Sequence, residues 1–196
     1  MAEARMARVD EIPRLAQTFA SAFSADPIFM WLTPERNRLE RLRRFFARQL
    51  KDTFEHGGVV TSEDGSGAAI WLPPDKWKVP IPTLIKSTPT AMRAFGMRLP
   101  RLLGSLTIIE KKHPEDPPHW YLEFLGTRRD VQRKGVGSAV IGLMLDRCDA
   151  EGIPAYLEAS SPENVPFYAR NGFEVREEVQ LKGAPNPVWA MMRQPR

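Results

Sequence analysis

Apolar residues recur every three or four positions in two stretches near the N-terminus, and this spacing predicts two amphipathic helices. The first covers residues 9–23 and the second runs from about Glu35 to Thr53, with a proline-interrupted connection between them. Their apolar stripes are Ile12, Leu15, Phe19 and Phe23 in the first helix, and Leu39, Leu42, Phe45 and Phe46 in the second. The many arginines of the second helix then fall mostly on its solvated face.

Short runs rich in β-branched, aromatic and large aliphatic residues predict strands. Two such runs flank the turn at residues 63–67 and suggest a meander, while residues 119–127 (HWYLEFLGT) are a strong strand candidate. Residues 152–160 predict another strand, and residues 173–181 and 187–193 predict a closing hairpin.

A helix is predicted between the strands at 119–127 and 152–160, from Gly135 to about Ala150. Strand, helix and strand in this order make a βαβ unit. A shorter helix follows over residues 161–172, where Ser161-Pro162 favours its start and Gly172 its end. The apolar face of the longer helix carries Val136, Val140, Leu143, Met144 and Cys148.

Residues 74–118 differ in character, because they combine many prolines with widely spaced apolar residues. We expect irregular loops and one or two helices there, inserted before the βαβ unit. The whole chain, residues 1–196, is therefore predicted to be one α/β (α+β) domain. Its central sheet is mixed, mostly antiparallel, and flanked by helices.

Composition narrows the class of protein. The net charge is +4 and the isoelectric point about 9.4, which favours an anionic partner. Cys148 is the only cysteine, so no internal disulfide can form, and three histidines scattered along the sequence lead us to expect no metal site. No apolar run approaches the ~18 residues of a membrane span and the N-terminus lacks an apolar leader. We expect a cytoplasmic protein that contacts no membrane.

Residues 131–140 (VQRKGVGSAV) have the character of a phosphate-binding loop, because two glycines follow two positive charges between a strand and a helix. The stretch lacks the Walker pattern G-x-x-x-x-G-K-[ST]. It also fails the dinucleotide pattern G-x-G-x-x-G, since Val140 replaces the third glycine. Instead it matches Q-x-x-G-x-G through Gln132, Gly135 and Gly137.

Three features of this loop would stabilise an anion. Its glycines let the backbone approach closely. The free N–H groups of the first helical turn point at the ligand, together with the helix dipole. Arg133 and Lys134 add positive charge.

With this loop, the chain resembles the GNAT superfamily of acetyl-CoA-dependent N-acetyltransferases. The resemblance spans nearly the whole sequence and is least diagnostic over residues 80–112. Within the superfamily, the order and residues of the matching segments are most similar to those of puromycin N-acetyltransferase-like proteins. One departure is Arg129, since the family often has proline three residues before the glutamine. The segments that carry the resemblance are AFSADP (22–27), AAIWLPP (68–74), HPEDPPHWYLEFLG (113–126), YLEASSPENVPFYARNGFEV (156–175) and WAMMRQP (189–195).

The resemblance implies a GNAT-type fold in which residues 119–175 bind acetyl-CoA, the co-substrate, without a metal. Two neighbouring strands would splay apart and receive the pantetheine arm, with an N–H near Leu125 stabilising the oxyanion. We expect any bulge to be easiest at Gly126. The implied cofactor contacts are Leu125, Gly126, Thr127, Gln132, Arg133, Lys134, Gly135, Val136, Gly137, Ser138 and Asn164.

Acetyl transfer to an amine needs a base, donors for the oxyanion and an acid for the leaving thiolate. Glu123 lies inside an apolar strand, where period-two alternation places it on the face of Tyr121 and Leu125, and family members often carry their base on this strand. Glu158, in the next strand, is the second candidate. Either carboxylate could instead be structural. Tyr168 matches the family tyrosine four residues before a Gly-Phe pair, which implies the general acid.

We therefore expect an enzyme that transfers an acetyl group from acetyl-CoA to a primary amine of a small molecule by direct attack in a ternary complex. Cys148, on the apolar face of a helix, is poorly placed to form an acyl-enzyme. Phe29, Trp31, Trp71, Trp77 and the insertion could form the acceptor pocket, although an aromatic residue of this kind is more often core than ligand wall.

Other functions stay open at this point. A catalytically silent acyl-CoA-binding regulatory module and an acetyltransferase of protein amines are alternatives. A third is a nucleic-acid-binding protein that uses the arginine-rich helix. We expect no nucleic-acid partner, and a monomer or homodimer.

Overall fold

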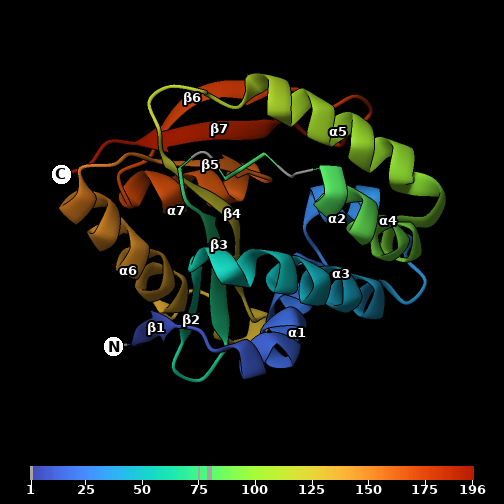
Figure 1. The fold of residues 1–196 in the computed structure, drawn as a ribbon, viewed down its shortest axis with the longest axis horizontal. Coiled ribbons are helices and arrows are strands. Elements are labelled where there is room, and N and C mark those ends of the chain that lie inside the picture. The colour runs from blue at the N-terminus through green and yellow to red at the C-terminus, as the bar shows by residue number, and fades with distance from the viewer. Residues whose placement is uncertain (1, 75, 79–80) are drawn as a thin grey trace.

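The computed structural model describes residues 2–74, 76–78 and 81–196, and seven strands in this part of the chain form one sheet (Figure 1). Among them only β4 and β5 are parallel neighbours, so the sheet is mixed and mostly antiparallel, as predicted. In spatial order the strands are β1 (Ala4–Met6), β2 (Val59–Ser62), β3 (Gly67–Leu72), β4 (Trp120–Thr127), β5 (Ala155–Ala159), β7 (Val188–Arg193) and β6 (Glu174–Val179).

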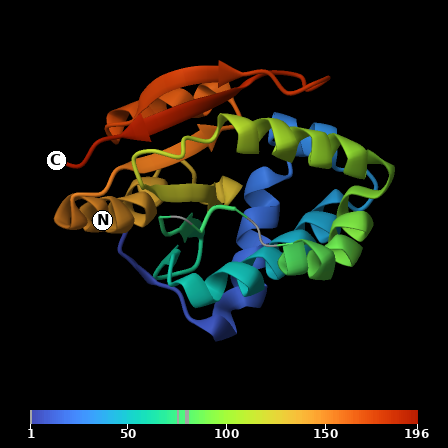
Figure 2. The ribbon, with the colours of Figure 1, turned by 45° about the horizontal axis from the view of Figure 1, so that its top comes forward.

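Helices cover both faces of this sheet (Figure 2). One face carries α6, and the other carries α1 and α3 beside α2, α4 and α5. The helices are α1 (Ile12–Phe23), α2 (Pro27–Leu32), α3 (Arg38–Thr53), α4 (Ile81–Phe95), α5 (Leu99–Lys112), α6 (Val136–Glu151) and α7 (Val165–Arg170). Short 3-10 turns lie at Val9–Glu11, Phe54–His56, Gly96–Arg98, Arg129–Val131 and Pro162–Asn164.

Most predicted helices form near their predicted positions, but one helix was not predicted, and two leucines were assigned to the wrong helix face. The connection after α1 contains α2, because Asp26 caps the helix by accepting a hydrogen bond from the Phe29 N–H at 3.0 Å, with Pro27 at the first helical position. Leu39 and Leu143, predicted on buried stripes, are 51% and 36% exposed. In both helices the buried stripe passes through neighbouring positions instead.

Four of the five arginines of α3, all except Arg38, are held by the protein's own acceptors. Glu40 accepts hydrogen bonds from Arg43 and Arg44, and Arg48 pairs with Asp52 at 2.7 Å. Arg41 donates to backbone carbonyls of α4. These contacts agree with the prediction that the charged face of this helix is an ordinary solvated surface.

A β-bulge interrupts β4 at Glu123. Ile70 of β3 pairs with Phe124, whereas the next residue, Trp71, pairs with Leu122. Glu123 is therefore the extra residue, and it reaches toward α3, where its Oε1 accepts a hydrogen bond from Gln49 Nε2 at 2.6 Å. The bulge was expected at Gly126.

The bulge also changes which side chains share a face. Leu122 and Leu125 both belong to the cluster beneath α6, the apolar cluster between the sheet and α6 that contains Val140 and Met144. Phe124 instead packs with the aromatic residues of α1 and α3. The alternation that placed Leu125 on the face of Tyr121 and Glu123 was therefore wrong. A period-two pattern in the sequence does not reveal that one extra residue is inserted into the strand.

β4 and β5 separate after three residue pairs. Trp120, Tyr121 and Leu122 pair with Ala155, Tyr156 and Leu157. Beyond these pairs, β4 continues beside β3 and β5 continues beside β7. A gap between two neighbouring strands of the sheet follows, as the predicted splayed pair requires.

Gly126 lets α1 come close to this part of β4. A Cβ at this position would lie 2.9 Å from Phe19 Cδ1 and 3.1 Å from Ala22 Cβ. Both neighbours belong to α1, and Phe19 is fully buried. The glycine therefore serves helix packing, which explains its place in an otherwise bulky strand.

We predict that Gly126→Ala destabilises the protein by about 1–3 kcal/mol, because the added methyl overpacks the contact with α1. The free energy of unfolding from urea titrations measures the effect. Gly104→Ala is the matched control, since a Cβ there meets no atom within 4 Å and alanine favours the helix by about 0.5–1 kcal/mol. Equal stability of Gly126→Ala and the unaltered protein would contradict the packing argument.

Candidate active site

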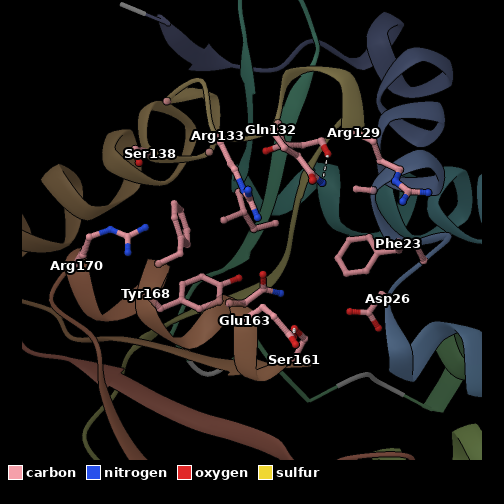
Figure 3. Close-up of a pocket in the computed structure, with 18 of the residues that line it drawn as sticks. Phe23, Asp26, Arg129, Gln132, Arg133, Ser138, Ser161, Glu163, Tyr168 and Arg170 are labelled. Carbon is pink, nitrogen blue, oxygen red and sulfur yellow. Dashed lines mark hydrogen bonds between the residues drawn. The ribbon is translucent and has the colours of Figure 1, made fainter.

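A cleft of about 850 Å³ opens beside the separated ends of β4 and β5 (Figure 3). Its walls come from four places: the end of β4, the loop that leads into α6, the turn and helix around α7, and the connection between α1 and α2. The lining residues are Ala22, Phe23, Ala25, Asp26, Pro27, Leu125, Thr127, Arg129, Gln132, Arg133, Gly135, Gly137, Ser138, Ser161, Glu163, Asn164, Phe167, Tyr168 and Arg170.

The loop before α6 is folded tightly against the end of β4. Gln132 Nε2 donates to the Thr127 carbonyl at 3.3 Å. Gly135 begins α6 with a φ of 83°, and Arg133 has a φ of 62°, so both adopt the left-handed conformation. This path brings the start of α6, at Gly137 and Ser138, to the cleft wall.

The wall formed by this loop is suited to an anion. The first N–H groups of a helix have no intrahelical acceptor, and they carry the positive end of the helix dipole. Three guanidinium groups, those of Arg129, Arg133 and Arg170, also line the cleft, and Figure 3 shows Arg133 reaching into it. Together these groups fit a ligand that carries several phosphate charges.

Tyr168 and Asp26 lie on opposite sides of the cleft (Figure 3). Burial, and next the charge of Asp26, raise the pKa of the Tyr168 phenol well above its ordinary value. Tyr168 therefore keeps its proton at neutral pH and can act as a hydrogen-bond donor. The pKa of Asp26 is itself raised by burial, against the hydrogen bonds that it accepts from Ser160 and from backbone N–H groups of α2.

Glu123 is a buried carboxylate with one free oxygen. Burial raises its pKa from 4.5 to about 7, opposed by the hydrogen bond from Gln49 and assisted by the charges of Glu158 and Asp52. Its Oε2 is buried and accepts no hydrogen bond from the described residues. A carboxylate with these properties exchanges protons near neutral pH, as a general base must.

Glu158 is more firmly held. Its Oε2 accepts the Tyr121 hydroxyl at 2.7 Å, and its Oε1 lies 3.5 Å from Nδ1 of His113. His113 and His119, which the sequence suggested were scattered, are only 2.9 Å apart between their Nε2 atoms. The loop between α5 and β4 turns back and brings them together.

The Acetyltransferase (GNAT) family model matches residues 73–173, just over half of the chain. The chain belongs to the GNAT acetyltransferase family. It is accordingly an acyltransferase, as the sequence motifs predicted, and the family uses acetyl-CoA as its acyl donor.

Known proteins agree with this assignment. An uncharacterized N-acetyltransferase of Schizosaccharomyces pombe is 26% identical over 216 residues, which covers 98% of this chain and 83% of the yeast protein. A solved structure from Corynebacterium glutamicum, described as histone acetyltransferase HPA2 and related acetyltransferase, has a TM-score of 0.76 at 24% identity and covers 100% of this chain and 97% of its own. The PaiA N-acetyltransferase of Thermoplasma acidophilum, solved with coenzyme A, has a TM-score of 0.59 at 12% identity, covering 99% of each chain.

The GNAT cleft brings together most of the residues predicted to contact the cofactor. Gly126, Lys134 and Val136 lie outside its lining. The Lys134 ammonium donates to the Asp130 carbonyl at 3.0 Å, and the Val136 side chain is buried against β3. The predicted residues in the lining are Leu125, Thr127, Gln132, Arg133, Gly135, Gly137, Ser138, Asn164 and Tyr168.

Neither of the two candidate bases lines the cleft. Glu123 and Glu158 are absent from its lining, although the charge of each affects the phenol of Tyr121. Of the aromatic residues proposed for an acceptor pocket, Trp71 is fully buried in the cluster beneath α6 and is core. Trp77 instead stacks on His113, with 3.9 Å between ring centroids.

Sequence reasoning missed several residues of the site. The sequence motifs did not identify Asp26 as a site residue. An Asp-Pro pair before an apolar run is nevertheless a helix-start signal that marks an ordered carboxylate. Arg129 was noted as a departure from the family pattern, yet it lines the cleft with Arg170. No local pattern signals that the α1–α2 connection faces the phosphate-binding loop.

None of the described helices is long and apolar enough to cross a membrane.

We predict that Glu123→Gln becomes more stable relative to the unaltered protein as pH rises. The folded-state pKa of Glu123, about 7, lies above its ordinary value of 4.5, so the native state holds this proton more tightly than the unfolded chain. The resulting stability is present below pH about 4.5 and is lost as pH rises through about 7, by up to about 3 kcal/mol. Glutamine cannot titrate and does not lose it.

Urea titrations from pH 5 to pH 8 measure the difference in unfolding free energy between Glu123→Gln and the unaltered protein. Glu55→Gln, at an exposed position, is the control and should show a constant difference. A constant difference for Glu123→Gln as well would mean that Glu123 is already ionised in the folded protein at pH 5.

Proposed function

We propose that this GNAT acyltransferase moves an acetyl group from acetyl-CoA to a primary amine of a small molecule, by direct attack in a ternary complex. The observation that carries the proposal is a single cleft with a polyanion-binding loop on one wall and the protonated phenol of Tyr168 on another. Beside it, Glu123 supplies a base that titrates near neutral pH.

Residues 119–175 form the acetyl-CoA-binding core in this proposal, and residues 74–118 form an insertion beside it. The amides at the start of α6 hold the pyrophosphate, with Gln132 ordering the loop and Arg133 contributing charge. Bound acetyl-CoA supplies the activated acyl group as a thioester. Leu125, Thr127 and Asn164, on facing walls of the cleft, hold the arm that carries it.

Glu123 prepares the acceptor. An alkylamine with a pKa of about 10.4 is mostly protonated at pH 7, and its loss of a proton there costs about 4.6 kcal/mol. The free Oε2 of Glu123 accepts this proton. Because Glu123 is not among the residues that line the cleft, we propose that the proton reaches it through water.

Tyr168 assists the leaving group. Its phenol remains protonated at neutral pH and donates toward the departing sulfur, which would otherwise leave as a thiolate. A raised phenol pKa makes complete proton transfer less favourable, so part of the effect comes from the hydrogen bond itself. Asp26, whose charge contributes to this raise, thereby keeps the acid in its donor form.

Cys148 takes no part in this reaction. It is completely buried in α6, and burial raises the pKa of its thiol to about 12. A thiol in this state supplies almost no nucleophilic thiolate at neutral pH. This supports direct attack by the amine over an acyl-enzyme.

A small-molecule amine acceptor is supported by the activity of a protein that shares this fold. A polyamine N-acetyltransferase of Drosophila melanogaster, which catalyses the formation of N-acetylagmatine, shares the fold with a TM-score of 0.69 at 13% identity over 99% of this chain. The resemblance to puromycin N-acetyltransferase-like proteins adds aromatic amines to the candidates. We place the reaction in the cytoplasm.

The experiment that tests the function is a thiol-release assay with acetyl-CoA and a panel of amines: polyamines, agmatine, arylalkylamines, puromycin, aminoglycosides and a lysine-rich peptide. We expect release of coenzyme A with at least one small amine. Turnover confined to the peptide would replace the small-molecule acceptor with a protein amine. Binding of coenzyme A without turnover of any acceptor would favour a silent binding module.

We predict that Tyr168→Phe lowers kcat by 10-fold to 1000-fold while the Kd for coenzyme A changes by less than about 3-fold, because the phenyl ring keeps the packing and loses only the donor. Steady-state kinetics and calorimetry measure the two effects. Unchanged kcat across the pH range would remove Tyr168 from the mechanism.

Gly135→Ala is the complementary variant. An L-residue at a φ of 83° costs about 1–2 kcal/mol and distorts the start of α6, so this change should weaken coenzyme A binding. The two variants therefore separate binding from chemistry.

A further inference from the structure

A buried polar cluster lies between the end of α5 and the sheet, outside the cleft. It contains His113 directly after α5, His119 directly before β4, and Glu158 of β5. The His113 and Glu158 side chains are only 1% and 7% exposed. The two histidines contact each other through Nε2 atoms 2.9 Å apart. Their proton positions are therefore constrained by hydrogen bonding rather than by solvent.

The chain of contacts can be followed from its outer end. His119 Nδ1 lies 2.8 Å from the Pro117 carbonyl oxygen, and a carbonyl only accepts, so this nitrogen carries a hydrogen. If His119 is neutral, its Nε2 is an acceptor and His113 Nε2 is the donor. A neutral His113 would then present a lone pair at Nδ1, 3.5 Å from Glu158 Oε1.

That arrangement leaves two lone pairs facing each other in a buried place. Glu158 Oε1 accepts no hydrogen bond from the described residues, and the buried hydroxyl of Tyr156, which interacts with Glu158, also has no partner. That hydroxyl can donate to the carboxylate, but it places no hydrogen between Oε1 and Nδ1 of His113, whose lone pairs still face each other. One extra proton on the histidine pair resolves the conflict. Whichever ring holds it, His113 then has a hydrogen on Nδ1, directed at Glu158. A proton on the pair also supplies the positive partner that a buried carboxylate needs.

The surroundings favour this positive charge. Each exposed ammonium group near the cluster is paired with a carboxylate, Lys112 with Glu177 at 2.6 Å and Lys78, which lies over the Trp77 ring, with Glu115 at 3.0 Å. The other titratable groups nearby are acidic or phenolic. Those groups are Asp52 of α3, Tyr121 and Glu123 of β4, Tyr156 of β5 and Glu177 of β6. Trp77 stacks on the His113 ring and shields it.

We propose that His113 and His119 are positioning residues that share one extra proton against Glu158, so that Glu123 alone of the two buried carboxylates receives the proton of the acceptor amine. Glu158, with the Tyr121 hydroxyl on one oxygen and the imidazolium near the other, stays ionised and in place. Glu123 keeps its Oε2 free. The inference rests on the proposed acetyl transfer, because it assigns the proton of that reaction.

The first test counts hydrogens on imidazole nitrogens and needs no turnover. Long-range ¹H–¹⁵N spectra of the full-length protein are recorded without ligand at pH about 8, and the exposed His56 serves as the reference imidazole. His56→Gln and His119→Gln assign the signals. We expect three N–H hydrogens on the His113–His119 pair and only two in Glu158→Gln, which keeps the shape and removes the charge. Two hydrogens in the unaltered protein, with Nδ1 of His113 bare, would overturn the proposal.

The second test is the pH profile of kcat/KM for His113→Asn, with an acceptor found in the amine panel. The asparagine amide can still donate to Glu158 but carries no charge, so Glu158 repels a second carboxylate more strongly. We expect the acidic limb of the profile to shift to higher pH by about one unit. At pH values below the limb, kcat/KM should then be about 10-fold lower than in the unaltered protein, and at higher pH the two should be equal. A merely structural role would lower kcat/KM equally at all pH values and would overturn the assignment.

The two tests separate this inference from the proposed function. If no amine is acetylated, the proposed function fails, and the proton count still decides whether the histidine pair holds the extra proton. If the count is three and the profile of His113→Asn is unshifted, the pair holds Glu158 without directing the proton to Glu123, and the proposal is wrong.

Discussion

The site depends on the separation of β4 from β5 after only three residue pairs. Neither strand loses its outer neighbour, because β4 stays paired with β3 and β5 with β7. The gap therefore forms inside a continuous sheet, where rigid strands hold its two sides. Helices α6 and α7 then place a helix start and a phenol at the same opening. A ligand that enters here meets both strand ends and both helices at once.

The bulge at Glu123 adds a second consequence to the same strand. By inserting one residue, it turns a carboxylate toward α3, into the layer that otherwise holds the stacked aromatic rings of α1 and α3. Burial there raises the pKa of the carboxyl toward neutrality, and a single hydrogen bond from Gln49 keeps it oriented. Glu158 sits in a different environment, surrounded by hydroxyl and imidazole groups. Two acids on adjacent strands thus acquire different properties from their neighbours rather than from their own chemistry.

Much of the fold could be read from the sequence, because its long helices and strands have regular apolar periods and clear end signals. The glycine loop that lines the cleft before α6 could also be found, since glycine spacing and position after a strand are local features. The failures share a physical cause. The bulge inserts one residue without changing composition, so the alternation along β4 misassigned Leu125. The pairing of His113 with His119, and the place of Asp26 opposite Tyr168, depend on how distant segments pack. Local periodicity carries no information about such contacts.

Asp26 links parts of the molecule that are usually considered separately. Its carboxylate caps α2, accepts the Ser160 hydroxyl just beyond β5, and acts electrostatically on Tyr168. The same carboxylate therefore ties the α1–α2 connection to the turn after β5 and raises the pKa of the Tyr168 phenol. A ligand that displaces this connection weakens the hydrogen bond between Asp26 and Ser160 and, at the same time, changes the electrostatic potential at the phenol. In the proposed reaction, the fit of the acceptor and the departure of the thiolate then both depend on this one carboxylate, and accommodating a bulkier acceptor requires adjustment at both of its contacts.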